Sequence, residues 1–246
     1  MKNHLLLAAG TCATLACSGA DGGVLPHESQ SYVVGIDISG SRTQNELAES
    51  KRLLNALIDN LEVGDKLTLV EMYQGGRTPA RQWSDSTREP RNPGKIGPSE
   101  LRRLDDFKAI ARMQAQILFD TTRAKEIKNT DILGTLVRAA DYSRPESNTR
   151  RTLLLLSDMI NDTPDVTMTT RDAIPTDAWI KRLSAEGRIP QLRGVCVLVS
   201  GADVSSARGA AIRSFWEKYF AAAGAHLDPE NYRNMIANAA DVSCGA

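Results

Sequence analysis

The sequence predicts an α/β protein with a doubly wound, mainly parallel sheet flanked by helices (a Rossmann-like fold). Strand-like and helix-like segments alternate along the chain, which is typical of this fold class. The strand-like segments 33–38 and 152–156 are nearly continuous apolar runs, as expected for parallel strands covered on both faces. A polar loop follows each of these two runs. The chain has 246 residues, enough for one domain with a substantial core.

The first half of the chain opens with the strand 33–38. Thr43-Gln-Asn-Glu46 then predicts a capping box at the start of a helix. Residues 66–73 alternate in polarity and predict a second strand. The segment Gly75–Ser99 is rich in Gly, Pro and Arg; it is either a functional loop or a solvated insertion, with one edge strand near 80–84. A long helix is expected over 100–124, with these residues as inward candidates: Leu101, Leu104, Ile110 and Ile117.

The second half continues the alternation. We expect helices over 131–142, 176–186 and 205–223, and strands over 152–156 and 194–200. Gly187 and Gly224 close the last two helices. The last helix carries an aromatic group expected to pack in the core: Phe215, Trp216, Tyr219 and Phe220. The pattern shows no sixth strand after it, so we expect a domain over 31–224 and an irregular tail over 225–246.

The N-terminus predicts export. Lys2 precedes a short apolar stretch, and small residues lead to Thr14-Leu-Ala-Cys17, so residues 1–17 have the pattern of a signal peptide. The end of this segment resembles a bacterial lipobox, in which Cys17 becomes the lipidated first residue; cleavage after Ala20 is the alternative. Residues 18–30 then form a flexible tether. The resemblance implies a lipoprotein of the bacterial cell envelope, anchored on the periplasmic side of the outer membrane.

The charge balance and the cysteines bear on the expected partners and on disulfide formation. Lys and Arg number 30, as do Asp and Glu, so nothing in the net charge predicts a nucleic-acid partner. Cys196 lies in an apolar strand, where a free cysteine acts as a small hydrophobe. That reading is favoured here over a disulfide with Cys244, although an exported protein can form one.

The residues best suited to bind a ligand follow the first strand, in Asp37-x-Ser39-x-Ser41. One carboxylate and two hydroxyls stand where open α/β sheets bind their ligands, and Mg²⁺ prefers oxygen ligands. Asp158 stands at the carboxyl end of the strand 152–156, and Thr130 stands at the start of the helix that precedes this strand. If the strands 33–38 and 152–156 are neighbours in the sheet, all five residues meet. Taken singly, each has an ordinary explanation as a turn or helix-capping residue.

In this order and context, the five residues resemble the metal-ion-dependent adhesion site (MIDAS) of von Willebrand factor type A (VWA) domains. Gly64-Asp65-Lys66-Leu67 and Thr130-Asp131-Ile132 add to the resemblance, which covers roughly 31–200. It implies that the following residues hold Mg²⁺ or Mn²⁺: Asp37, Ser39, Ser41, Thr130 and Asp158. It also implies that the cation accepts a carboxylate from a partner protein, in adhesion or envelope assembly, without turnover.

Two enzyme classes compete with this interpretation. Residues 34–41 also resemble the first phosphate loop of actin-like ATPases, but the second, similar half of that fold is missing from the pattern. A haloacid-dehalogenase-type phosphatase needs a second Asp where Ser39 stands. No general base is evident, since His4, His27 and His226 lie outside the five-residue group.

Overall fold

The computed structural model describes residues 28–73, 80–87, 96–120, 129–146 and 148–242. The expected signal peptide, the lipidation of Cys17, most of the expected tether, most of the Gly75–Ser99 segment and Cys244 therefore lie outside the described residues.

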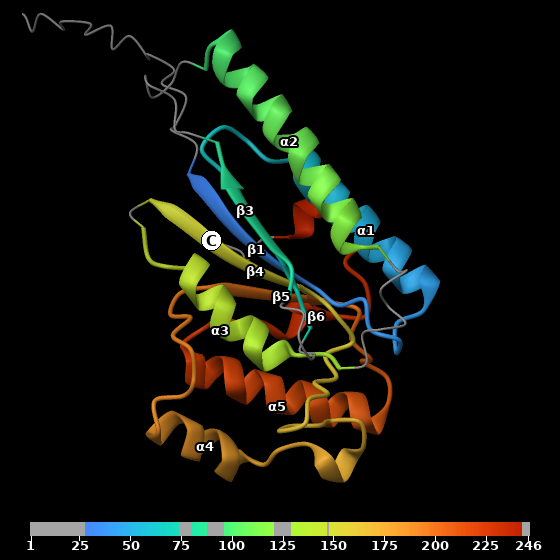
Figure 1. The fold of residues 1–246 in the computed structure, drawn as a ribbon. Helices are drawn as coiled ribbons and strands as arrows, with labels where there is room; N and C mark the ends of the chain where they lie inside the picture. Colours follow the sequence, from blue (N-terminus) through green and yellow to red (C-terminus); the bar gives the residue numbers. More distant parts are fainter. Residues whose placement is uncertain (1–27, 74–79, 88–95, 121–128, 147, 243–246) are drawn as a thin grey trace, which may run out of the picture.

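A single six-stranded sheet forms the centre of the molecule (Figure 1), with the strand order β3-β2-β1-β4-β5-β6. The strands are β1 (Ser29–Ile36), β2 (Lys66–Glu71), β3 (Gln82–Ser86), β4 (Thr149–Leu156), β5 (Cys196–Ser200) and β6 (Tyr232–Arg233). Only β3, at one edge, runs antiparallel to its neighbour. This order is that of doubly wound folds, and it confirms the predicted fold class.

Helices cover both faces of the sheet (Figure 1). The helices α1 (Gln44–Asp59) and α2 (Pro98–Leu118) pack on one face, and α3 (Ile132–Tyr142), α4 (Asp177–Ala185) and α5 (Ala207–Ala223) pack on the other. Three short 3₁₀ helices complete the described chain: η1 (Arg171–Ala173), η2 (Pro229–Asn231) and η3 (Ala239–Asp241).

The capping box predicted at the start of α1 is confirmed. The backbone N–H of Glu46 donates to Thr43 Oγ1 at 3.3 Å, and the backbone N–H of Thr43 donates to Glu46 Oε2 at 2.7 Å. Two otherwise unpaired N–H groups are thereby satisfied, which sets where the helix begins after the Asp37–Ser41 loop.

The predicted inward face of α2 is wrong. Leu101, Ile110 and Ile117 are 50%, 41% and 42% exposed, and Leu104 is only partly buried. The buried face instead consists of Phe107, Ala111, Ala115 and Leu118. Phe107 stacks on Trp83 of β3 at 5.9 Å between ring centroids. Small alanines let α2 approach the sheet closely, and a pattern that counts only large apolar residues does not detect such a face.

The aromatic residues of α5 form the centre of the other core layer, as expected. Phe215, Trp216, Tyr219 and Phe220 are buried, and Phe215 and Trp216 meet edge to face at 5.0 Å between ring centroids. Trp179 of α4 packs on Phe215. These contacts pack α5 against α4, and both helices belong to the same core layer as residues of β4 and β5.

The segment after α5 corrects the expectation that no sixth strand follows this helix. A short sixth strand, β6, does pair with β5, and Ile236 and Val242 are buried against the α1 layer. The strand has only two residues, too few for a periodic pattern to reveal it.

Cys196 corrects a second expectation. It is disulfide-bonded rather than free, and the chain's other cysteines lie outside the described residues.

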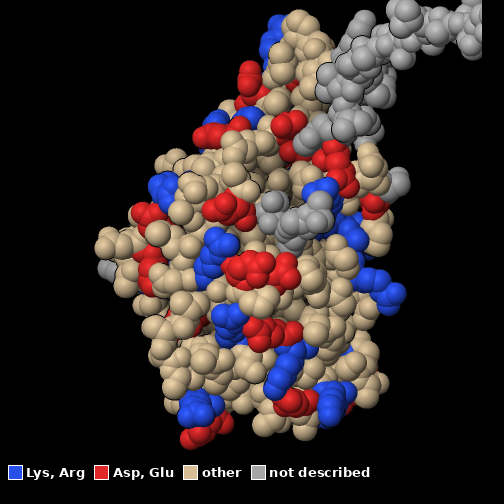
Figure 2. All heavy atoms as spheres, turned by 180° about the vertical axis from the view of Figure 1, so that it is seen from behind, with Lys and Arg blue, Asp and Glu red and all other residues tan. Residues whose placement is uncertain are grey.

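The surface carries both signs of charge in close mixture. On the face opposite to that of Figure 1, Lys and Arg side chains alternate with Asp and Glu (Figure 2), in keeping with the formal net charge of zero. None of the described helices has the length and apolar character needed to cross a membrane.

Candidate metal centre

The five predicted site residues come together where β1 and β4 lie side by side. This is the point at which the strand order reverses, and open α/β sheets bind ligands there. The backbone N–H of Asp37 donates to Leu156 O at 3.1 Å, which carries the pairing of the two strands into the loops. Thr130 joins from the start of α3, because the N–H of Asp162, in the loop after β4, donates to its carbonyl at 2.9 Å.

Asp37 is the buried centre of this group, with 0% exposure. Its Oδ1 accepts a hydrogen bond from the Ser39 backbone N–H at 2.9 Å and a long one from Thr130 Oγ1 at 3.5 Å. Its Oδ2 accepts from Ser157 Oγ at 2.8 Å. One carboxylate thus connects the loop after β1, the start of α3 and the end of β4. Sequence reasoning missed Ser157, whose signal was only its place beside Asp158.

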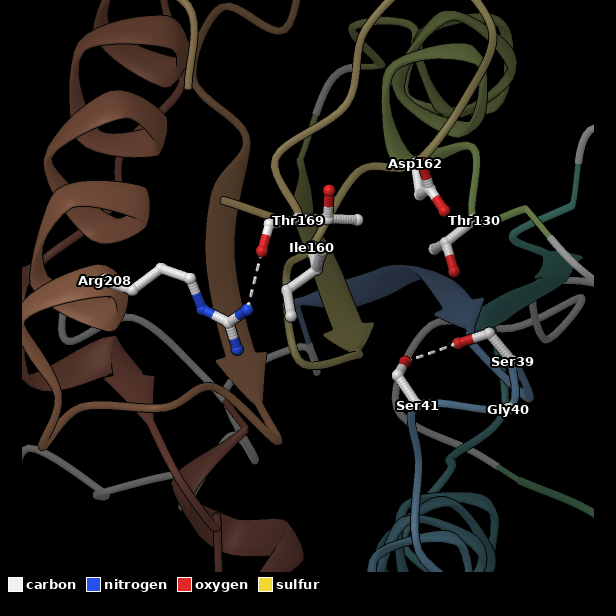
Figure 3. A pocket seen from close by; sticks show the side chains of 8 residues that line it. All are labelled: Ser39, Gly40, Ser41, Thr130, Ile160, Asp162, Thr169 and Arg208. Atoms are coloured by element: carbon white, nitrogen blue, oxygen red, sulfur yellow. Dashed lines mark hydrogen bonds between the residues drawn. The ribbon is translucent and has the colours of Figure 1, made fainter. Parts of the chain in front are cut away.

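The hydroxyls of Ser39 and Ser41 face each other at 2.9 Å between their Oγ atoms (Figure 3). Ser39 is buried, whereas Gly40 and Ser41 are exposed, so the loop is open to solvent on its outer side. Ser41 lies near Asp158, and its hydroxyl lowers the pKa of that carboxyl. The two serines therefore lie between the two aspartates.

Asp158 stands in an unfavourable environment for a negative charge. Burial, with the nearby charge of Asp37 as the second cause, raises the pKa of Asp158 from 3.8 to about 6. Hydrogen bonds from the Ile160 backbone N–H and from Ser41 oppose this rise, as does the charge of Arg42. The two aspartates therefore repel each other when both are ionised.

Arg42 supplies the positive charge behind the site. Its guanidinium is buried; Nη1 donates to Leu156 O at 3.0 Å and Nη2 to Ser50 Oγ at 3.0 Å. Nε has no hydrogen-bond partner among the described residues and lies 3.9 Å from Glu46 Oε2. Sequence reasoning missed this role, because an Arg at the start of a helix normally points to solvent.

The loop after Asp158 is held from both sides. Met159 adopts a φ of 65°, a left-handed conformation that is rare for a bulky residue, and the indole N–H of Trp216 donates to its carbonyl at 2.9 Å. On the other side, Asn161 Oδ1 accepts from the backbone N–H groups of Ile132 and Leu133, at 3.0 and 3.1 Å. Core packing in α5 and the start of α3 therefore fix the position of Asp158.

A hollow of about 430 Å³ opens above the serines (Figure 3). The residues that line it are Ser39, Gly40, Ser41, Thr130, Ile160, Asp162, Thr169 and Arg208. It leaves the hydroxyl face of the site open to the outside.

The donor set fits a hard divalent cation. No group of three or more His, Cys, Asp or Glu side chains suited to a metal occurs among the described residues, but this site offers two carboxylates and three hydroxyls. Mg²⁺ and Mn²⁺ take such oxygen ligands, and Mg²⁺ keeps several waters. A cation here would also remove the repulsion between Asp37 and Asp158.

Among known proteins, this chain is similar to solved structures but matches no curated sequence. No protein-family model and no curated protein sequence matches the chain. One similar crystal structure is an aerotolerance-related membrane protein from Bacteroides fragilis (14% identity, TM-score 0.42, 82% of this chain and 92% of that one). Another is BatB from Bacteroides thetaiotaomicron (17% identity, TM-score 0.39, 70% of this chain and 65% of that one). A third is the VWA domain of SpRpn10 (12% identity, TM-score 0.37, 83% and 90%).

The strand order of this chain confirms the doubly wound, mainly parallel fold predicted from the sequence, and the five predicted site residues meet at its reversal point. Metal binding by these residues stays a prediction.

The first test concerns the charge of Asp158. A raised folded-state pKa means that the protein loses stability as pH rises from about 4 through about 6. Without metal, Asp158→Asn should therefore be more stable than the wild type at pH 7.5, by up to roughly 3 kcal/mol for a shift of about two units. Below pH 4 the difference should vanish. Urea unfolding in EDTA at both pH values measures this.

Asp165→Asn is the matched control, because Asp165 is an exposed residue of the same loop. It should change stability little at either pH. A wild type that is more stable than Asp158→Asn in EDTA at pH 7.5 would contradict the proposed repulsion.

The second test concerns the support from α5. Trp216→Phe removes the N–H that pairs with the Met159 carbonyl, and should lower the free energy of unfolding by about 1–3 kcal/mol. It should also weaken Mg²⁺ binding, because Asp158 is no longer held in place. Trp179→Phe, which changes a half-buried ring with no indole hydrogen bond among the described residues, is the control. Unchanged Mg²⁺ affinity in Trp216→Phe would show that Asp158 is positioned without Trp216.

Proposed function

We propose that this chain is a protein-binding module whose Mg²⁺ or Mn²⁺ site engages an acidic side chain of a partner protein. The observation that carries the proposal is the meeting of Asp37, Ser39, Ser41, Thr130 and Asp158 at the reversal point of the sheet. The cation would supply an electrophilic centre with a position open to the partner's carboxylate.

The chain's residues have distinct roles in this proposal. The hydroxyls of Ser39 and Ser41 would hold the cation directly, and that of Thr130 would contact it when a partner is bound. Asp37 and Asp158 would balance its charge, directly or through water. Asp37 also orders the loop, since it accepts the Ser39 backbone N–H and the Ser157 hydroxyl.

Binding without turnover is part of the proposal. His226, the one histidine within the described residues, lies with its Nε2 2.9 Å from Asp228 Oδ1 and does not line the hollow above the serines. The alternative is an actin-like ATPase that uses the 35–41 loop for phosphate. Detectable ATP binding or metal-dependent phosphoester hydrolysis would favour it.

The third test removes the hydroxyl ligands. The protein should bind one Mg²⁺ or Mn²⁺, and Ser39→Ala with Ser41→Ala should weaken binding more than about 10-fold, since even residues behind the ligands have effects of that size. Titration calorimetry measures the affinity. Capture of membrane proteins by the immobilised protein should fail in EDTA and with the double variant.

Ser184→Ala, on the exposed surface of α4, is the control and should bind and capture like the wild type. Circular dichroism checks that the double variant is folded. Capture that survives both EDTA and the double substitution would place the partner interface elsewhere on the molecule.

We also propose that the protein is anchored in the bacterial cell envelope through lipidated Cys17, on the periplasmic side of the outer membrane. The signal-like segment 1–17 and its lipobox-like end support this. The fourth test is fractionation of cells that express the wild type or Cys17→Ala. The wild type should sediment with membranes, and the variant should lose the anchor. If both are soluble and equally processed, simple secretion is correct.

A further inference from the structure

Arg208 is a cationic side chain at the proposed binding site whose charge no described residue neutralises. It lies in the first turn of α5 and points into the hollow above Ser39 and Ser41 (Figure 3). Its Nη1 donates to Thr169 O at 2.9 Å, which holds the side chain across the opening. It forms no ion pair with any residue that the structure describes, and its other guanidinium nitrogens make no hydrogen bond there.

Arg208 also separates two neighbouring hollows. The second, of about 270 Å³, shares Ser41, Ile160 and Arg208 with the first and extends toward Asp158 and Asp203. The carboxylate of Asp203 accepts hydrogen bonds from the backbone and hydroxyl groups of Ser205 and Ser206, three of them at Oδ1, and it forms no ion pair with Arg208. Since Arg208 donates only to Thr169 O among the described residues, its other N–H groups can bind an anion from outside.

The opposite wall of the hollow carries the opposite charge. Asp162 lies beside Thr130, across from Arg208 (Figure 3). Its side chain makes no hydrogen bond or ion pair with any described residue, although its backbone N–H pairs with Thr130 O. The hollow is thus polarised, positive on the α5 side and negative on the α3 side.

We propose that Arg208 binds a second carboxylate of the partner, so that the partner segment carries two acidic residues, one for the cation and one for Arg208. This rests on the proposed function and adds a specificity-determining residue to it. A guanidinium with free N–H donors matches a carboxylate in charge and geometry. Asp162 repels a second acid placed on its own side and so sets the direction in which the segment lies.

The experiment uses blocked peptides of Gly and Ser with one central Asp, alone or with one Glu at one to five positions before or after it. Their dissociation constants for the purified protein in Mg²⁺ are measured by NMR titration, which reaches millimolar values. One direction of Glu placement should bind about 10-fold or more tighter than the single-acid peptide, as expected for a hydrogen bond to a charged group. The other direction should bind no tighter.

The variants separate charge from structure. Arg208→Gln should bring the favoured two-acid peptide to within about twofold of the single-acid peptide, and Arg208→Lys should retain part of the gain as a point charge. Neither should lower Mg²⁺ affinity, because Arg208 is not a proposed ligand of the cation. Asp162→Asn should improve the peptides with Glu in the disfavoured direction. Arg188→Gln, at an exposed site that lines neither hollow, is the control.

The outcomes distinguish this inference from the proposed function. If the single-acid peptide binds in Mg²⁺ and not in EDTA, but no second Glu improves binding, Arg208 has no such role and the metal-dependent function stands. A full gain that persists in Arg208→Gln, or a loss of Mg²⁺ affinity in that variant, also overturns the inference. If no peptide binds in Mg²⁺, the proposed function fails and this inference fails with it.

Discussion

The buried carboxylate of Asp37 is the interaction on which the rest of the site depends. It accepts hydrogen bonds from Ser39, Thr130 and Ser157, which belong to three different loops. The sheet makes this possible, because β1 and β4 are neighbours and release their chains at the same edge. Ser39 and Ser41 can face each other only because the backbone of their loop is bound to that carboxylate.

The same arrangement creates an electrostatic cost. Asp158 is placed near Asp37 in a buried environment, which raises its pKa to about 6. The positive charge of Arg42 offsets part of this cost, while the hydroxyls of Ser39, Ser41 and Thr130 line the hollow on the open side of the site. A divalent cation on that side would complete the charge balance. The core supports the arrangement from a distance, since Trp216 holds the loop that carries Asp158.

Much of the fold and of the candidate site was predictable from the sequence, but several of the supporting contacts were not. Asp37, Ser39 and Asp158 follow apolar strands directly, so strand order alone brings them together. Ser157, Arg42 and Trp216 act through contacts between residues far apart in the chain, and a local pattern carries no signal for such contacts. The inward face of α2 was predicted wrongly because two of its four buried residues are alanines, and β6 was missed because a strand of two residues shows no periodic pattern.

The most direct test of the central claim is a crystal structure of the protein grown with Mn²⁺, with anomalous diffraction recorded to locate the ion. We predict one strong peak between the hydroxyls of Ser39 and Ser41, with Mn²⁺–oxygen distances of about 2.0–2.3 Å, close to those of Mg²⁺. Asp37 and Asp158 should lie around it, directly or through water. An ordered site without a peak, or Mn²⁺ bound only to other carboxylates, would contradict the account.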